Sequence, residues 1–319
     1  MEVKKPLIII AGPTACGKTA ASVALAKKIN GEIISGDSMQ VYRHMDIGTA
    51  KIMPSEMQGV SHYMIDILEP DEEFNAMLFQ KMAKQYMSEI YYKNHIPILA
   101  GGTGFYINAL VYDNNFMETK FPVRAQLEQE RKTFGDMYIY ERLKECDPQY
   151  AASIHPNNMK RVMRALEYFL QTGKKLSVSN IEAHEKETPY DIAFFVLNMD
   201  REKLYKRIDM RVEKMFSDGL LEEFRILYER GYNENLVSMQ AIGYKELFLY
   251  IRGEISLEEA KEKIKADTRH FAKRQITWFK HQCDGIWIDT DGMTGDEVAD
   301  KLYGILKEKK TAIQALGDI

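Results

Sequence analysis

The sequence has no apolar run long enough to cross a membrane. A membrane-spanning helix needs about 20 mostly apolar residues, whereas the longest apolar runs, 7–11 and 96–100, have the length of a single strand. The first residues lead from charged side chains into a glycine-containing turn, without the longer apolar stretch of a secretory signal. We therefore expect a protein that does not interact with membranes.

Cysteine is also scarce. The three cysteines, Cys16, Cys146 and Cys283, stand far apart in the sequence. Their spacing fits neither a disulfide framework nor the paired cysteines of a zinc site. This usage is typical of a reducing compartment, and the expected location is cytoplasmic.

An excess of positive charge is missing as well, since the formal net charge is −4. A protein that coats nucleic acid irrespective of its sequence would be basic overall, so any RNA binding must depend on local basic surfaces. Two stretches without an acidic residue, 156–166 and 268–283, could supply such surfaces. Either stretch could equally be the solvated face of a helix.

The 319 residues are enough for about two domains. Short apolar runs alternate with helical patterns at the start of the chain, which predicts an α/β fold with a parallel sheet and helices on both faces. We expect strands at 7–11, 32–35, 62–67 and 96–100, and helices at 18–29 and 75–93.

The pattern changes after residue 112. We expect a linker at 113–123, then helices over 124–172 with breaks at Gly135, Asp147-Pro148 and Pro156, then a polar loop at 176–188. Later elements are expected as strands at 192–199 and 285–289 and helices at 201–217, 219–230, 239–251, 257–281 and 295–310. The predicted domains are a core of residues 1–112 and 191–319 and an all-helical insertion at 113–190.

The first predicted strand is followed by GPTACGKT, which matches the phosphate-loop pattern G-x-x-x-x-G-K-[ST]. Glycines let successive N–H groups turn inward to a phosphate, the lysine adds a positive charge, and the threonine hydroxyl is placed for Mg²⁺. The motif predicts a polyphosphate site in a P-loop core, without identifying the polyphosphate. Its residues are Gly12, Pro13, Thr14, Ala15, Cys16, Gly17, Lys18 and Thr19.

Two further polar segments follow predicted strands. GDSMQ begins at residue 36, and GGTG begins at residue 101. Because the carboxyl ends of parallel strands meet at one edge of the sheet, Lys18, Thr19, Asp37 and Thr103 should face one crevice. Asp37 is either a general base, an indirect magnesium partner or only a turn residue, and Thr103 either orients a reacting group or only caps a helix.

An obvious hydrolysis apparatus is also missing. An ordinary ATPase or GTPase places a magnesium-binding aspartate at the end of a strand, whereas the strand at 96–100 ends in Ala-Gly-Gly-Thr. This favours a group transferase with a phosphorylated donor. Arg207 and Arg211, four residues apart on one predicted helix face, could hold the leaving pyrophosphate, or could form surface ion pairs with Asp209 and Glu213.

Two other functions stay open from the residues alone. The first is a P-loop kinase that transfers phosphate from ATP to a nucleoside or small molecule, with the helical insertion as its lid. The second is an RNA-binding regulator that uses the phosphate loop as a switch, which the missing strand-end aspartate disfavours.

Several longer segments resemble the tRNA dimethylallyltransferases, also called tRNA isopentenyltransferases. These segments are GPTACGKT, SGDSMQVYR with DIGTAK, AGGTGFY, HPNNMKRVMRALE, QAIGYKE and AKRQITWF. The resemblance implies transfer of a dimethylallyl group from dimethylallyl diphosphate to the exocyclic amine of the adenosine immediately 3′ of the anticodon. The tRNAs would be those that read codons beginning with U, and the product would be isopentenyladenosine.

The resemblance also implies roles for residues. The phosphate loop would bind the donor's diphosphate and Mg²⁺, and Asp37 would accept the amine proton; some family descriptions call the loop an ATP site, although the reaction consumes no ATP. The insertion would clamp the anticodon stem-loop, and we expect a monomer. Contacts to tRNA are implied for Asp37, Ser38, Met39, Gln40, Thr103, Arg124, Lys160, Arg161, Val162, Met163, Arg164, Gln240, Ala241, Ile242, Gly243, Tyr244, Lys245, Lys273, Arg274, Gln275, Ile276, Thr277, Trp278, Phe279 and Lys280.

Overall fold

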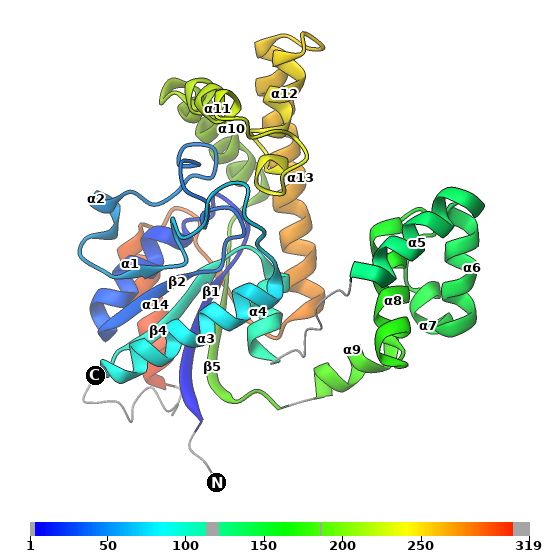
Figure 1. The fold of residues 1–319 in the computed structure, drawn as a ribbon. Coiled ribbons are helices and arrows are strands. Elements are labelled where there is room, and N and C mark those ends of the chain that lie inside the picture. The colour runs from blue at the N-terminus through cyan, green and yellow to red at the C-terminus, as the bar shows by residue number, and fades with distance from the viewer. Residues whose placement is uncertain (1–3, 113–120, 186, 309–319) are drawn as a thin grey trace. The chain divides into compact units, whose positions relative to one another are not determined.

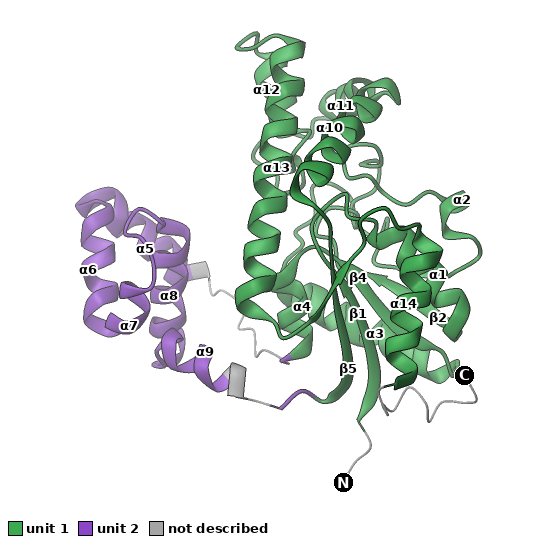
Figure 2. Ribbon diagram, turned by 180° about the vertical axis from the view of Figure 1, so that it is seen from behind, with its two compact units in different colours: residues 1–111, 189–319 green, residues 112–188 purple. Residues whose placement is uncertain are grey.

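The chain forms two compact units. The structure, a computed structural model, describes residues 4–112, 121–185 and 187–308. One unit consists of Met1–Val111 with Pro189–Ile319, and the other of Tyr112–Thr188 (Figure 2). The second unit begins at residue 112, whereas the insertion was expected to begin at 113. It ends at residue 188, whereas the insertion was expected to end at 190.

The larger unit is built on a parallel sheet, which in the described residues has six strands in the order β3-β2-β4-β1-β5-β6. The strands are β1 (Lys5–Ala11), β2 (Gly31–Ser35), β3 (His62–Tyr63), β4 (Ile96–Gly101), β5 (Tyr190–Asn198) and β6 (Ile286–Asp289). Ile8 of β1 pairs with Ile98 of β4 and with Ala193 of β5. Because β1 is central, the segment that follows it lies in the middle of the carboxyl edge.

Helices cover both faces of this sheet (Figures 1 and 2). Alternate strand residues point to opposite faces, so Ile8 and Ile10 pack against α1 (Lys18–Ile29) and α14 (Gly295–Glu308), while Leu7 and Ile9 are buried on the side of α3 (Ala76–Tyr92) and α4 (Gly104–Val111). The predicted α/β class is confirmed. The remaining helices of this unit are α2 (Pro54–Met57), α10 (Arg201–Ser217), α11 (Leu220–Glu229), α12 (Lys245–Ile251), α13 (Leu257–Gln282) and a short 3₁₀ helix (Ser238–Gln240).

The smaller unit is helical and has its own core. Its helices are α5 (Phe121–Phe134), α6 (Asp136–Cys146), α7 (Pro148–Ala152), α8 (Met159–Thr172) and α9 (Leu176–Glu185). Leu127, Ile139 and Leu143 pack against Val162 and Leu166 of α8, and all five are buried. The breaks expected near Gly135, Pro148 and Pro156 fall between these helices, because glycine and proline interrupt helical hydrogen bonding.

Three expected elements were wrong in type or extent. The loop expected at 176–188 contains α9, which is anchored because both the N–H and the hydroxyl of Ser177 donate to the buried Asp147 carboxylate. The strand expected at 62–67 has only two residues, since Met64 and Asp66 adopt positive φ angles of 66° and 53°. The helix expected at 239–251 is broken at Gly243, where φ is 105°.

Two expectations fall partly on undescribed residues. Residues 113–120 of the expected linker lie outside the described part of the chain, and α5 takes up the remaining three, 121–123. The expected end of the last helix at 310 also lies outside it. Within the described residues, no helix combines the length and the apolar character that a membrane crossing requires.

A buried carboxylate, Glu32, lies at the amino end of β2. It accepts hydrogen bonds from the Tyr63 hydroxyl at 2.5 Å and the Lys93 ammonium at 3.1 Å, and the His95 ring nitrogen Nδ1 lies 2.7 Å from it. Burial alone would raise the pKa of Glu32, but these hydrogen bonds together hold the pKa below its ordinary value. The ionised carboxylate therefore stabilises this edge of the sheet.

We expect Glu32→Gln to lower the free energy of unfolding most at neutral pH. A carboxylate whose pKa is depressed by folding stabilises the protein above its unfolded pKa of about 4.3, and this contribution is lost as the pH falls through the folded value. The difference in melting temperature between wild type and variant should therefore shrink as the pH falls from 7 to below about 4. The exposed Glu222→Gln serves as control, and a pH-independent difference for Glu32→Gln would contradict the assignment.

Candidate functional site

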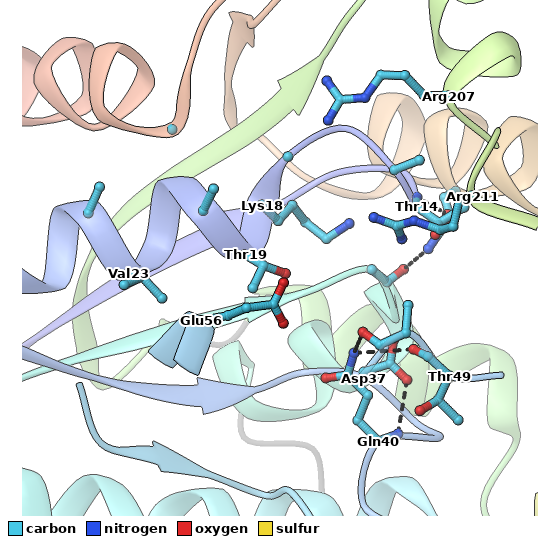
Figure 3. Close-up of a pocket in the computed structure, with 18 of the residues that line it drawn as sticks. Thr14, Lys18, Thr19, Val23, Asp37, Gln40, Thr49, Glu56, Arg207 and Arg211 are labelled. Atoms are coloured by element: carbon cyan, nitrogen blue, oxygen red, sulfur yellow. Dashed lines mark hydrogen bonds between the residues drawn. The ribbon is translucent and has the colours of Figure 1, made fainter. Parts of the chain in front are cut away.

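A cavity of about 470 Å³ opens at the carboxyl edge of the sheet (Figure 3). Its wall combines the phosphate loop after β1, Asp37 and Gln40 after β2, and Gly102 after β4. Helix α10 adds Arg207 and Arg211, and α13 adds Phe271 and Gln275. The structure thus brings together segments that are far apart in the sequence, as expected for the carboxyl ends of parallel strands.

The phosphate loop is shaped by its first glycine and closed by its lysine. Gly12 has a φ of 146°, and a Cβ atom there would lie 2.4 Å from the backbone oxygen of Leu197 in β5, so only glycine fits. The Lys18 ammonium donates to the backbone oxygens of Gly12 at 2.9 Å and Pro13 at 2.6 Å. The lysine is therefore held across the loop, with the exposed Thr19 at the first turn of α1.

Three cations, Lys18, Arg207 and Arg211, line the cavity without a salt bridge to any carboxylate of the described residues. Burial lowers the pKa of the Lys18 ammonium, and the Arg211 guanidinium lowers it further. Burial and the neighbouring Arg207 likewise lower the pKa of Arg211. Within the described part of the chain, none of the three forms a salt bridge, so a bound polyanion would relieve their mutual repulsion.

The two α10 acids considered as partners of the arginines, Asp209 and Glu213, are engaged elsewhere. Asp209 pairs with Arg269 of α13, and the Glu213 carboxylate lies 2.5 Å from the Lys265 ammonium, also on α13. The surface ion pairs considered as an alternative for Arg207 and Arg211 are therefore not formed. One face of α10 instead binds α13, while another presents two arginines to the cavity (Figure 3).

Asp37 closes a turn and also lines the cavity. Its Oδ1 atom accepts hydrogen bonds from the N–H groups of Met39 at 2.8 Å and Gln40 at 3.3 Å, so Asp37 does close a turn. The same residue lines the cavity that Lys18 lines, and the two charges interact. Thr103 lies one residue beyond the cavity-lining Gly102, immediately before α4.

The Gln40 side chain holds the next part of the wall. Its Nε2 atom donates to the backbone oxygens of Ala50 at 3.2 Å and Thr49 at 3.4 Å, and Ser35 donates to its Oε1 atom at 3.2 Å. Thr49 and Ala50 both line the cavity. Gln40 therefore stabilises the protein wall with the same amide that was expected to contact tRNA.

Several residues expected to contact tRNA are buried in the protein, and their contacts with tRNA stay predictions. The buried residues are Val162, Met163, Ala241, Gly243, Tyr244, Gln275 and Phe279. Arg124 forms ion pairs with the buried Glu167 at 2.9 Å and with Glu128 at 3.0 Å, so its charge is balanced within the smaller unit. The exposed cations among the expected contacts are Lys160, Arg161, Lys273, Arg274 and Lys280.

Sequence reasoning missed Glu223 of α11. Its carboxylate accepts hydrogen bonds from three successive N–H groups, those of Asp46 at 2.8 Å, Ile47 at 2.8 Å and Gly48 at 3.0 Å, and from the Tyr244 hydroxyl at 2.6 Å. Glu223 thus fixes the loop that continues into the cavity wall at Thr49. No local pattern marks this glutamate, since an acid on an amphipathic helix is usually a solvated residue.

The chain alone offers little to hold a metal ion. Among the described residues, no three side chains of histidine, cysteine, aspartate or glutamate come together as ligands. The Thr19 hydroxyl and the oxygens of a bound polyphosphate form the donor set that Mg²⁺ prefers at phosphate loops. A magnesium ion fits this cavity as a companion of the phosphates.

The fold and cavity define a P-loop α/β protein, with cations on the wall of a cavity at the carboxyl edge of its sheet. Comparisons with known proteins identify its family within this class. The family model described as IPP transferase matches residues 40–282. A tRNA dimethylallyltransferase of Lachnoclostridium phytofermentans is 53% identical over 309 residues, 96% of this chain and 99% of the relative. Another from Alkaliphilus oremlandii is 49% identical over 289 residues, 90% and 92% of the two chains.

Solved structures agree with these relatives. The full-length tRNA isopentenylpyrophosphate transferase from Bacillus halodurans has a TM-score of 0.73 at 41% identity, with 98% of each chain covered. A eukaryotic dimethylallyltransferase acting on tRNA has a TM-score of 0.82 at 29% identity, with 98% of this chain and 84% of that chain covered. The chain belongs to the IPP transferase family.

We expect Arg211→Gln to weaken the binding of inorganic pyrophosphate by about 10- to 100-fold, because a charge-assisted hydrogen bond is worth about 1.5–3 kcal/mol. Isothermal titration calorimetry in the presence of Mg²⁺ measures this affinity. Arg201→Gln is the matched control, since Arg201 lies on the same helix but is exposed and outside the cavity wall. Equal affinities for Arg211→Gln and wild type would remove Arg211 from the anion site.

Proposed function

We propose that this chain transfers the dimethylallyl group of dimethylallyl diphosphate to the exocyclic amine of the adenosine immediately 3′ of the anticodon. The substrates would be tRNAs that read codons beginning with U. The observation that carries this proposal is a cavity with three cations that no described carboxylate pairs, and with the Asp37 carboxylate on its wall. The names of the relatives support the choice of donor and acceptor.

The cation cluster suits the leaving group. When the bond between the allylic carbon and oxygen breaks, negative charge develops on the diphosphate while the positive charge spreads over the allyl group. Loop N–H groups, Lys18, Arg207 and Arg211 would stabilise that negative charge. Lys18 is already held by the loop before the reaction, so its charge needs little reorganisation during the step.

Asp37 suits the other half of the reaction. The adenine amine is a poor nucleophile because its lone pair is shared with the ring, and it must lose a proton as the new bond between nitrogen and carbon forms. The turn uses Oδ1 of Asp37, so Oδ2 is the atom to which we assign this proton. General-base help of this kind is typically worth about 10²- to 10⁴-fold in rate.

Mg²⁺, when bound, would offset negative charge on the diphosphate. The Thr19 hydroxyl would hold it, with diphosphate oxygens as further ligands. A role for ATP at the loop, a monomeric state and a cytoplasmic location stay predictions.

The tRNA would bind through exposed cations in each unit. Lys273, Arg274 and Lys280 are exposed on α13, and Lys160 and Arg161 are exposed on α8. The half-buried Trp278 lies between the α13 cations in sequence, which suits stacking with a base next to phosphate contacts. A stacked base cannot reach a closed cavity, so we expect the target adenosine to be flipped out of its loop.

We expect labelled dimethylallyl diphosphate to modify unmodified tRNA in the presence of the protein and Mg²⁺. Nucleoside analysis of the digested tRNA should then show labelled isopentenyladenosine. A parallel reaction with γ-labelled ATP and nucleosides tests for a kinase. Phosphorylated nucleoside without any prenylated adenosine would contradict the proposal.

Asp37→Asn should lower the single-turnover rate by about 10²- to 10⁴-fold, because the amide keeps the acceptor atom of the turn but cannot take the proton. Binding of tRNA should change little. Rapid-quench kinetics at saturating substrates measures the rate. Asp71→Asn, at an exposed site outside the cavity wall, is the control, and an unchanged rate in Asp37→Asn would exclude Asp37 as the base.

The double variant Lys273→Gln, Arg274→Gln should weaken tRNA binding and flatten its salt dependence. Each lost phosphate contact lowers the slope of log affinity against log salt by about 0.7–0.9, so the slope should fall by about 1.5. Filter binding measures the slope between 50 and 200 mM salt. Over this range the affinity of proteins with several phosphate contacts falls by about 10³-fold or more, so a change of slope is measurable. If the slope of the double variant equals that of wild type, Lys273 and Arg274 belong to a solvated helix face and do not contact tRNA.

A further inference from the structure

Gln275 is a buried polar residue within 268–283, one of the two basic stretches without an acidic residue. Its neighbours on α13, Lys273 and Arg274, are exposed, whereas Gln275 is only 7% exposed and lines the cavity. A buried side-chain amide needs partners for both of its ends. The family resemblance implied a tRNA contact for Gln275. In the structure, its amide instead bonds to backbone groups of the protein.

The amide joins two loops at the carboxyl edge of the sheet. Its Oε1 atom accepts a hydrogen bond from the Thr14 N–H in the phosphate loop at 2.8 Å. Its Nε2 atom donates to the backbone oxygen of Gly102, after β4, at 3.0 Å. One planar side chain therefore sets the spacing between the segments that follow β1 and β4.

The contact leaves no spare room. A Cβ atom at Gly102 would lie 2.1 Å from Nε2 of Gln275 and 3.3 Å from the backbone oxygen of Gly12. Gly102 is therefore a glycine because the amide and the phosphate loop approach its backbone so closely. A displacement of the amide would be passed on directly to both loops.

The loop after β4 is also hydrogen-bonded to the segment after β2, which carries the proposed base Asp37. The Gly36 N–H donates to the Ala100 backbone oxygen at 2.8 Å, and the Thr103 N–H donates to the Gly36 backbone oxygen at 3.4 Å. A Cβ atom at Gly101 would lie 2.4 Å from that Gly36 oxygen. A continuous set of contacts thus runs from the phosphate loop through Gln275 and Gly102 to Gly36, the residue before Asp37.

We propose that Gln275 is a positioning residue for the transfer reaction: its amide fixes the phosphate loop relative to Gly102, and through Gly102 relative to Asp37. The inference rests on the proposed function, because it concerns the spacing between the leaving diphosphate and the base. Since the Thr14 N–H is already engaged, the loop N–H groups that hold the diphosphate come after Thr14. Misplacing reacting groups by about 1 Å can cost about 10²-fold in rate.

The test compares Gln275→Met with wild type. Methionine has a similar length but cannot donate or accept as the amide does. We expect kcat to fall by about 10- to 100-fold, while the KM for tRNA and the Kd for inorganic pyrophosphate stay within about 3-fold. Gln85→Met is the matched control on the exposed face of α3, where Gln85 bonds only to Glu89 in the described contacts, and its kcat should equal that of wild type.

Gln275→Glu provides a readout that a merely structural role would not move. A protonated carboxyl group has one acceptor oxygen and one O–H donor, the same pattern as the amide, whereas the ionised form turns two acceptors toward the Thr14 N–H and the Gly102 oxygen. Its rate relative to wild type should therefore rise as the pH falls from 8 to about 5.5. The relative rate of Gln275→Met should stay constant with pH.

The outcomes separate the two proposals. A wild-type protein without transfer activity would overturn the proposed function. Hydrogen exchange would then still test the contact, because the N–H groups of Gly12 and of residues 14–17 should exchange faster in Gln275→Met than in wild type. Unchanged exchange or an unchanged kcat would overturn the positioning role. A loss confined to tRNA affinity would make Gln275 an RNA contact, and a loss that follows the melting temperature would make it only structural.

Discussion

The rest of the site depends on the unpaired cation cluster of Lys18, Arg207 and Arg211. Bringing like charges together near a buried loop is unfavourable unless an anion arrives. The fold maintains the cluster in two ways. Backbone oxygens of the phosphate loop hold Lys18. Cations of α13 pair with Asp209 and Glu213 of α10, so these two acids do not neutralise the arginines. The resulting positive field is available to a diphosphate whose charge increases during the reaction.

The parallel sheet explains why an acid can stand beside this cluster without neutralising it. The loops after β1, β2 and β4 share one edge, and the turn that Asp37 closes keeps its carboxylate on the cavity wall. Side chains from distant helices then fix these loops. Gln275 joins the loops after β1 and β4, and Glu223 fixes the segment that leads to Thr49. In the proposed reaction, the diphosphate and the proton-accepting Asp37 would thus be held by loops that are bonded to one another.

The elements that follow local rules could be predicted from the sequence. The phosphate loop, the alternation of strands and helices, and the shared edge of Lys18, Thr19 and Asp37 all follow from glycine spacing and hydrophobic periodicity. Contacts made by single side chains over long sequence separations could not be predicted in this way. Gln275 and Glu223 lie on amphipathic helices whose pattern gives no sign of their backbone partners. Tyr244 and Phe279 belong to segments that resemble the family, yet both side chains are buried. The helix α9 was missed because its stability comes from packing and from Asp147, not from its polar composition.

A crystal structure with the unreactive thiolo analogue of dimethylallyl diphosphate tests the central claim most directly. The claim predicts that the diphosphate lies within hydrogen-bonding distance of the Lys18 ammonium and both α10 guanidinium groups. It also predicts that the first allyl carbon faces Oδ2 of Asp37, with space between them for one amine nitrogen. A diphosphate bound away from these cations, or an allyl carbon directed away from Asp37, would contradict it.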